Sequence, residues 1–248
     1  MFKSKKLMIP VLFASSLSVQ AGWLDFIEET VNATTGSSSS DLAKSALSNS
    51  EVVTGLKDAL ANGVETAIKT LGKPGGFAQN QLVHIALPDS VKTLATTARA
   101  MGQGQYVDSF EATMNQAAEK AVPEAASILS DAIRTMSIDD AMKILNGPDD
   151  AATQYFRRVS GKTLETRFRP IVAEATNATG ATQSYKQLTG QANPLLGNLL
   201  KGSSLDLDQY VTNKALDGLF YYIAQQEKEI RSNPAARTTE ILQKVFSK

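Results

Sequence analysis

Residues 52–71 read VVTGLKDALANGVETAIKTL, and this stretch decides the fold class. Its apolar side chains recur at steps of three and four residues, which places them on one face of an α-helix and does not fit a strand. The residues of this face are Val52, Val53, Leu56, Leu60, Val64, Ile68 and Leu71. Ser50 precedes them as a candidate N-cap, and Gly72 and Pro74 follow as stop signals. The stretch therefore predicts an amphipathic helix with one buried face.

The same spacing continues along the chain and predicts further helices over residues 89–101, 106–121, 123–136, 138–145, 208–231 and 235–246. Asp149-Asp150 opens another helix, and Leu164 to Ala175 mark the next one, which Pro170 either kinks or divides. Residues 77–88 fit either a short helix or an extended packing segment, and residues 177–205 are the most loop-like. We therefore predict an all-α fold, a single globular bundle of about eight to ten helices over residues 51–248.

Composition removes several classes of function. The chain has 248 residues with no Cys and a single His, which excludes disulfides, thiolate metal sites, iron–sulfur clusters and sites built on several imidazoles. Its 25 Lys and Arg balance 25 Asp and Glu, whereas a nucleic-acid-binding surface needs a strong basic excess. We therefore expect no metal, no cofactor and no nucleic-acid partner.

The first 21 residues are typical of a secretory signal peptide. Lys3, Lys5 and Lys6 precede an apolar run of about 11 residues, and the sequence from Val19 to Ala21 fits a cleavage site. A membrane anchor is the alternative, but a spanning helix needs about 20 apolar residues. We expect cleavage after Ala21, no transmembrane segment in the mature chain, and an exported protein, with the periplasm as the preferred location.

Residues 22–50 form an N-terminal segment followed by a Ser-rich linker. Trp23, Phe26 and Ile27 give this segment an apolar patch. We interpret the patch as a short terminal helix packed on the main body, with a contact for a partner or membrane surface as the alternative.

Familiar catalytic patterns each fail at a specific position. Residues 161–163 end like a phosphate-binding loop, but Phe156 stands where the first Gly is needed. A calcium-loop pattern that starts at Asp206 has Val211 in place of its Gly. His84 lies among apolar residues and is interpreted as a structural histidine. The sequence therefore assigns no catalytic residue.

A run of positive charge lies between residues 157 and 169. It contains five cations against one acid, Glu165, which gives +5 − 1 = +4; the cations are Arg157, Arg158, Lys162, Arg167 and Arg169. Guanidinium groups match phosphate and carboxylate groups, so the cluster is a candidate site for an anionic head group. The alternative is that these cations pair with nearby acids, for which Asp149 and Asp150 are the best candidates.

Two further sets of polar residues are candidates for a site. Asp150, Gln154 and Arg158 are spaced by four residues along one helix face, which forms either a polar network inside the bundle or the wall of a cleft.

The second set lies in the last long helix. Asp217 sits in an apolar stretch, where a buried carboxylate would need a partner such as Arg237. The neighbouring Gly218 is best explained by the close approach of another helix. Tyr221 and Tyr222 either line a ligand pocket or pack in the core.

Five stretches carry a family resemblance over residues 55–246: Gly72-Lys73-Pro74 with Gly76-Phe77, then AVPEA at residues 121–125, AMKILNGPDDAATQYFRR at 141–158, TNKALDGLF at 212–220 and NPAARTT at 233–239. In content and order they resemble a bacterial exported family, domain of unknown function 4197. The resemblance implies an all-helical exported domain with no assigned activity, and it supplies no catalytic residues.

We hold two functional hypotheses. The first is a non-enzymatic periplasmic binding or scaffold protein for an amphipathic ligand or an envelope protein, with the basic segment at the polar end of a helical cleft and Tyr221 and Tyr222 in its wall. The alternative is a carboxylate-based hydrolase acting on a cell-envelope polymer, for which Asp149, Asp150 and Asp217 are the candidate acids. A purely structural protein without a ligand is a third possibility.

Overall fold

The structure is a computed structural model that describes residues 49–178 and 206–232. These residues form eight helical elements: α1 (Asn49–Leu71), α2 (Asp89–Ala100), α3 (Gly104–Ala121), the short 3-10 helix η1 (Val122–Glu124), α4 (Ala125–Arg134), α5 (Ile138–Leu145), α6 (Ala151–Ala178) and α9 (Leu207–Ser232). The described residues contain no strand, which confirms the all-α fold. The total of about eight to ten helices stays a prediction, because the rest of the chain, including the predicted helix 235–246, lies outside the described residues.

Local signals fix the ends of the predicted helix over residues 138–145. The Ser137 hydroxyl accepts a hydrogen bond from the Asp140 backbone N–H at 3.1 Å and donates one to the Asp140 carboxylate at 2.7 Å. This arrangement is a capping box in which Asp takes the usual place of Glu. At the other end, α5 stops at Leu145, directly before Asn146-Gly147-Pro148. The predicted boundaries of this helix are confirmed.

Helix α6 is continuous where the sequence predicted two helices. Pro170 lies inside it, so of the two alternatives the one in which Pro170 divides the helix is wrong, and no break separates the two predicted helices. Leu164 and Phe168 before the proline and Val172 after it are all fully buried. Pro170 itself is exposed. Burial of one apolar face on both sides of the proline holds the helix together, although Pro lacks one backbone donor.

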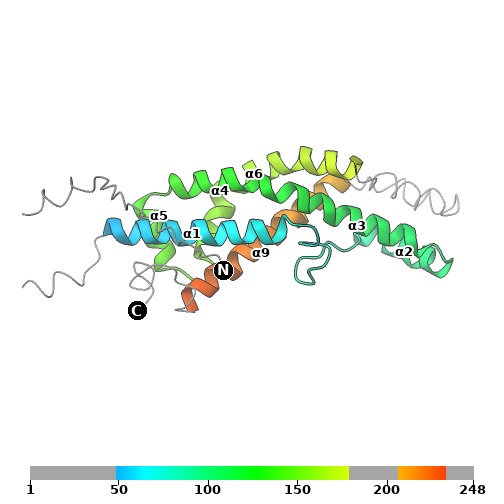
Figure 1. Cartoon of the computed structure of the whole chain (residues 1–248), viewed down its shortest axis with the longest axis horizontal. Helices are drawn as coiled ribbons and strands as arrows, with labels where there is room; N and C mark the ends of the chain where they lie inside the picture. The colour runs from blue at the N-terminus through cyan, green and yellow to red at the C-terminus, as the bar shows by residue number, and fades with distance from the viewer. Residues whose placement is uncertain (1–48, 179–205, 233–248) are drawn as a thin grey trace, which may run out of the picture. The chain divides into compact units, whose positions relative to one another are not determined.

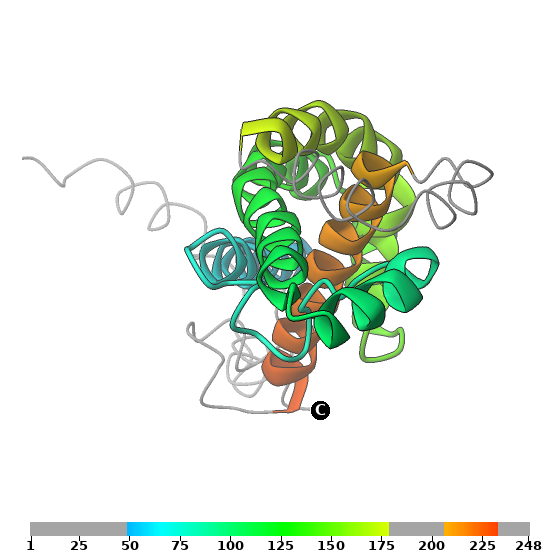
Figure 2. The ribbon, with the colours of Figure 1, turned by 90° about the vertical axis from the view of Figure 1, so that its right-hand side faces the viewer.

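Helices α6 and α9 make the most extensive contact in the described residues, and α9 also packs on α1 and α3. The two helices are antiparallel, since the start of α6 contacts the end of α9 through Glu227, while Thr176 near the end of α6 contacts Asp208 near the start of α9. Figures 1 and 2 show α9 in orange crossing the bundle against its neighbours. All described helices contribute to one hydrophobic cluster. The largest fully buried side chains in it are Phe77, Phe110, Phe156, Phe168, Leu56, Leu71, Ile85, Met114, Leu129, Leu164 and Leu219.

Between α1 and α2 the chain runs as a non-helical segment, residues 72–88, which we call the strap. It consists of turns and residues without regular structure, so the short-helix alternative of the sequence analysis is wrong. The Phe77 ring packs on α9 at Gly218, where an added Cβ would lie 2.7 Å from Phe77 Cε1 and 3.2 Å from Val83 Cβ. The small size of Gly218 thus allows the strap to pack closely on α9, whereas the sequence analysis expected the close approach of another helix.

Two polar side chains of α3 hold the backbone of the strap. Glu119 accepts hydrogen bonds from the backbone N–H groups of Phe77 and Ala78, both at 3.0 Å. The Asn115 amide accepts from the backbone N–H of Ile85 at 2.9 Å and donates to the Ile85 carbonyl at 3.0 Å. Glu119 and Asn115 are both buried. They supply the partners that a long segment without regular structure needs for its backbone.

A third buried polar side chain, Glu227 of α9, caps the start of α6. Its carboxylate accepts from the backbone N–H groups of Ala152 and Thr153 at 2.9 and 3.0 Å. It also pairs with Arg231, which donates in turn to the Ile144 carbonyl at the end of α5 at 2.7 Å. The first N–H groups of a helix have no partner within the helix, and a negative charge is favoured there. One residue of α9 therefore fixes the start of α6, and a second joins α9 to α5.

Two glycine positions give a matched test of this packing. We expect Gly218→Ala to lower the free energy of unfolding by about 1–3 kcal/mol, because the new methyl group overlaps the buried Phe77 ring. We expect Gly161→Ala in α6 to raise it by roughly 1 kcal/mol, because no atom lies within 4 Å of its added Cβ and Ala favours a helix. Urea unfolding of both variants measures the difference. A Gly218→Ala protein as stable as the wild type would contradict the Phe77 contact.

Candidate functional site

The predicted cationic cluster divides into separate surface ion pairs. Arg157 contacts Asp217 at 3.3 Å and Arg158 contacts Asp140 at 3.4 Å. The other two pairs are Lys162 with Glu165 at 3.0 Å and Arg169 with Asp206 at 2.6 Å. Arg167 is exposed and forms no ion pair within the part of the chain that the structure describes.

The predicted partners of this cluster, Asp149 and Asp150, pair with none of the four paired cations. They lie exposed in the turn before α6. Of the observed partners, Asp217 belongs to α9, Asp206 directly precedes α9, and Asp140 belongs to α5. For Arg157 and Arg169 the antiparallel packing of α6 on α9 supplies acids that are distant in sequence, whereas Lys162 pairs with Glu165 of its own helix. Exposed pairs of this kind contribute little to stability, and they leave no concentrated positive charge for an anionic head group.

The predicted face of Asp150, Gln154 and Arg158 is present in part. Gln154 donates to the Asp150 carboxylate at 2.8 Å, and Arg158 turns away from both toward Asp140. Gln154 and Arg158 line one cavity of about 320 Å³ between α5 and α6, together with Asp140, Lys143, Ile144, Pro148, Ala151 and Tyr155. Two of the three residues of this face therefore line a surface cavity, and Asp150 does not.

The structure corrects the interpretation of Asp217. Its side chain is 61% exposed, so it is a surface carboxylate and not a buried one. Its partner is Arg157, whose guanidinium group also stacks over the Phe220 ring at 4.4 Å from the ring centre. The partner predicted for Asp217, Arg237, lies outside the described residues.

Tyr221 and Tyr222 differ in their surroundings. The Tyr222 hydroxyl accepts a hydrogen bond from the Asn80 side chain of the strap, and its ring packs against the core. Tyr221 is 37% exposed and meets the Tyr222 ring edge to face. Tyr222 therefore helps to hold the strap on α9, which fits the packing alternative better than the wall of a pocket.

A cavity that the sequence analysis did not predict lies between α1 and α4, and we call it the α1/α4 groove. Its volume is about 440 Å³. The buried side chains among its lining residues are all aliphatic: Val64, Ile68 and Ile133. The exposed lining residues are Ala61, Glu65, Lys69, Pro123, Ala126 and Ser130, of which Glu65 and Lys69 form an ion pair.

Short side chains produce this groove. Ala61 on α1 and Ala126 and Ser130 on α4 are exposed and too small to cover the aliphatic residues beneath them. The sequence signal for it is the presence of small residues beside the apolar face of each helix. That signal acquires meaning only when the packing of α4 on α1 is known, which is why the sequence analysis missed the groove.

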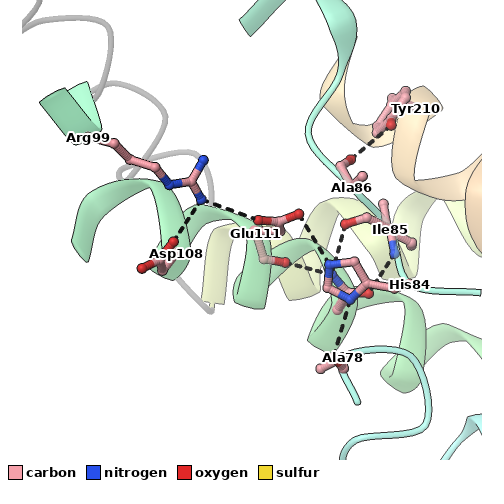
Figure 3. A network of polar contacts seen from close by, with 9 residues as sticks. Ala78, His84, Ile85, Ala86, Arg99, Asp108, Glu111 and Tyr210 are labelled. Carbon is pink, nitrogen blue, oxygen red and sulfur yellow. Dashed lines mark hydrogen bonds and ion pairs between the residues drawn. The ribbon is translucent and has the colours of Figure 1, made fainter. Parts of the chain in front are cut away.

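His84 belongs to a polar network on the strap (Figure 3). One ring nitrogen, Nδ1, lies 3.2 Å from the Ala78 carbonyl, and the other, Nε2, lies 3.1 Å from the Glu111 carboxylate of α3. Figure 3 shows Glu111 between His84 and Arg99, and Arg99 also binds Asp108 at 2.8 Å. Both nitrogens of the imidazole ring are thus engaged. This supports the structural interpretation of the histidine.

None of the three acids nominated for a hydrolase, Asp149, Asp150 and Asp217, is buried among the described residues. A carboxyl group that acts as a general acid requires a raised pKa. The hydrogen bond from Lys92 lowers the pKa of Asp89, and hydrogen bonds from Lys162 and Gln209 lower the pKa of Glu165. Asp149 and Asp150 are exposed, and Asp217 is paired with Arg157.

Two further findings concern the described residues only. No group of three or more His, Asp or Glu side chains is placed there to hold a metal ion. None of the helices in that part of the chain combines the length and the apolar character that crossing a bilayer requires.

The phenol group of Tyr155 gives a pH-dependent prediction. Burial raises its pKa above the usual value of about 10, with a further contribution from the charge of Asp140, and its hydroxyl donates to the Ala132 carbonyl at 3.1 Å. The unfolded chain therefore loses this proton at lower pH than the folded chain, so the contribution of Tyr155 to stability is complete below about pH 10 and is lost as the pH rises through the folded pKa.

We expect the stability difference between the wild type and Tyr155→Phe to be constant near neutral pH and to move in favour of the variant above about pH 10. Urea unfolding of both proteins over this pH range measures it. A difference that stays constant at high pH would show that Tyr155 ionises equally well in both states.

The family comparison identifies the chain at the level of its family. The model of a family described as a protein of unknown function, DUF4197, matches residues 46–247. No curated protein and no solved structure matches the chain. Because the family model covers well over half of the sequence, the chain belongs to the DUF4197 family.

Proposed function

We propose that the protein is an exported, non-enzymatic binding protein that takes the apolar part of an amphipathic ligand into the α1/α4 groove. The observation that supports this proposal is the apolar lining of the groove, in which buried aliphatic residues lie beneath small exposed ones. Among the lining residues, only Glu65 and Lys69 are charged. Its volume of about 440 Å³ lies in the range of small-molecule pockets.

The charge distribution supports an apolar contact as the source of binding energy. Four of the five cations of the 157–169 segment are paired with acids on the surface. A ligand head group would have to compete with these acids, whereas removal of aliphatic surface from water is favourable without any exchange of partners. We therefore propose the α1/α4 groove as the binding site, and the basic segment named in the sequence analysis is no longer part of the proposal.

The predicted signal peptide supports an extracytoplasmic role. A ligand with a hydrocarbon part dissolves poorly in water, so a protein that carries it through an aqueous compartment must shield that part. The ion pair of Glu65 and Lys69 lies at the groove, where the polar end of such a ligand would reach solvent.

Filling the groove tests the proposal with a matched control. Ala126 lines the groove and is exposed, while the adjacent Ser127 is exposed on the same helix and is not among the lining residues. We expect the apolar fluorescent probe N-phenyl-1-naphthylamine to bind the wild type and Ser127→Phe with similar affinity. We expect Ala126→Phe to weaken binding by at least about tenfold, because its ring occupies the volume the probe needs.

The titration is followed by probe fluorescence, and unfolding curves establish that both variants are folded. Equal binding by Ala126→Phe and the wild type would show that the probe binds elsewhere, and the groove would then lose its assigned role.

The mass of the exported protein tests the remaining part of the proposal. We expect native mass spectrometry of protein exported by cells and purified without detergent to give residues 22–248 with an added mass of a few hundred daltons, on the order expected for a pocket of this size. A chain that retains residues 1–21 would contradict cleavage after Ala21. A clean mass without an adduct would count against a small-molecule ligand and in favour of a protein partner.

A further inference from the structure

Gly161 is a residue of α6 that the packing of the protein does not explain. Glycine is among the poorest helix formers, so a glycine within a long helix needs a reason. At Gly218 the reason is the Phe77 ring, and at Gly63 it is contact with Gln226 and Ile230 of α9. At Gly161 no atom lies within 4 Å of an added Cβ. The space over Gly161 is therefore open within the described part of the chain.

A cavity of about 320 Å³ lies over this glycine, between α6 and α9. Its polar lining residues are Arg157, Glu165, Asn213 and Asp217, and its apolar ones are Leu216 and Phe220. The two apolar side chains are buried. Both helices thus contribute lining residues to the cavity. Because Gly161 has no side chain, a ligand could approach the backbone of α6 closely there.

The polar groups around Gly161 have hydrogen-bonding capacity that the described residues do not use. Arg157 donates one hydrogen bond, from Nη1 to Asp217 Oδ1 at 3.3 Å, although a guanidinium group has five N–H donors. Asn213 accepts from Gln209 through Oδ1 at 2.8 Å, which leaves its two amide N–H donors. Asp217 keeps a second carboxylate oxygen as an acceptor. The lining of the cavity therefore offers both hydrogen-bond donors and hydrogen-bond acceptors.

The charges of the cavity disfavour a strongly anionic ligand. One guanidinium group, Arg157, faces two carboxylates, Asp217 and Glu165, and the latter is also neutralised by Lys162. A phosphate or carboxylate would lie beside these acids without a surplus of positive charge to hold it. A neutral ligand that both donates and accepts hydrogen bonds has no such cost.

We propose that the cavity over Gly161 binds a neutral, hydroxyl-rich ring, a sugar unit of a saccharide. Its hydroxyl groups accept from Arg157 and Asn213 and donate to Asp217, while one face of the ring lies on the backbone at Gly161. This site is separate from the α1/α4 groove, because the two cavities share no lining residue. The inference does not depend on the proposed function.

The test uses two neutral oligosaccharides of defined composition, chitotriose and maltotriose, with inorganic phosphate as an anionic probe. Nuclear magnetic resonance reports binding directly, through the backbone amide of Gly161 and the side-chain amide of Asn213. We expect millimolar additions of at least one saccharide to shift both signals, and we expect phosphate to shift neither.

Substitutions locate the site. Gly161→Phe fills the cavity, and Thr163→Phe places the same ring at an exposed position of α6 that does not line it. We expect the first to raise the Kd at least about tenfold and the second to leave it unchanged. Arg157→Lys keeps the charge and removes the planar set of donors, and we expect it to weaken binding as well.

Three results would overturn the inference. The first is the absence of shifts at Gly161 and Asn213 with both saccharides. The second is an equal response to phosphate, which would assign the cavity to anions. The third is unchanged saccharide binding by a folded Gly161→Phe protein, which would place the saccharide elsewhere on the surface.

Discussion

A carboxylate buried in the interior, that of Glu227, determines how the two longest helices of the described chain lie against each other. Its side chain is only 3% exposed, and burial of an ion is costly unless hydrogen bonds and an opposite charge replace water. The first backbone N–H groups of α6 and the guanidinium group of Arg231 provide that replacement. Because these partners exist only when the start of α6 meets the end of α9, the requirement fixes their register, and α1 and α3 pack on the resulting pair.

Buried polar side chains also bind backbone groups in the strap, where the chain is not helical. Glu119 and Asn115 of α3 satisfy backbone groups of the strap, and Phe77 of the strap packs on Gly218. The stretches that carry the family resemblance meet at such joints: an added Cβ at Gly72 would lie 3.0 Å from Pro123, and Phe77 lies on Gly218. These sequence features build the fold. They explain why the resemblance predicts the architecture.

Candidate functional surfaces are those where polar groups or apolar side chains have no partner that the packing of the described helices supplies. The charged side chains of the basic segment are largely neutralised in pairs at the surface, and each such pair is worth little. Two hollows among the described residues carry our proposals: the α1/α4 groove, with its aliphatic floor, and the cavity over Gly161, with its unused hydrogen-bonding groups. They differ in chemistry, which is why we propose a hydrocarbon chain as the ligand of the first and a polar ring as the ligand of the second.

The sequence by itself determined what depends on neighbouring residues. Helical periodicity predicted α1 and α9, and the signals at Ser137 and at Asn146-Gly147-Pro148 predicted both ends of α5, because caps and amphipathic faces act within a few residues.

Tertiary structure decided the rest. Continuity of α6 through Pro170, the pairing of Arg157 with Asp217, the strap contact at Gly218 and the α1/α4 groove all depend on residues that are far apart along the chain. No local pattern encodes such a contact, because it exists only once helices have packed and their side chains share one surface.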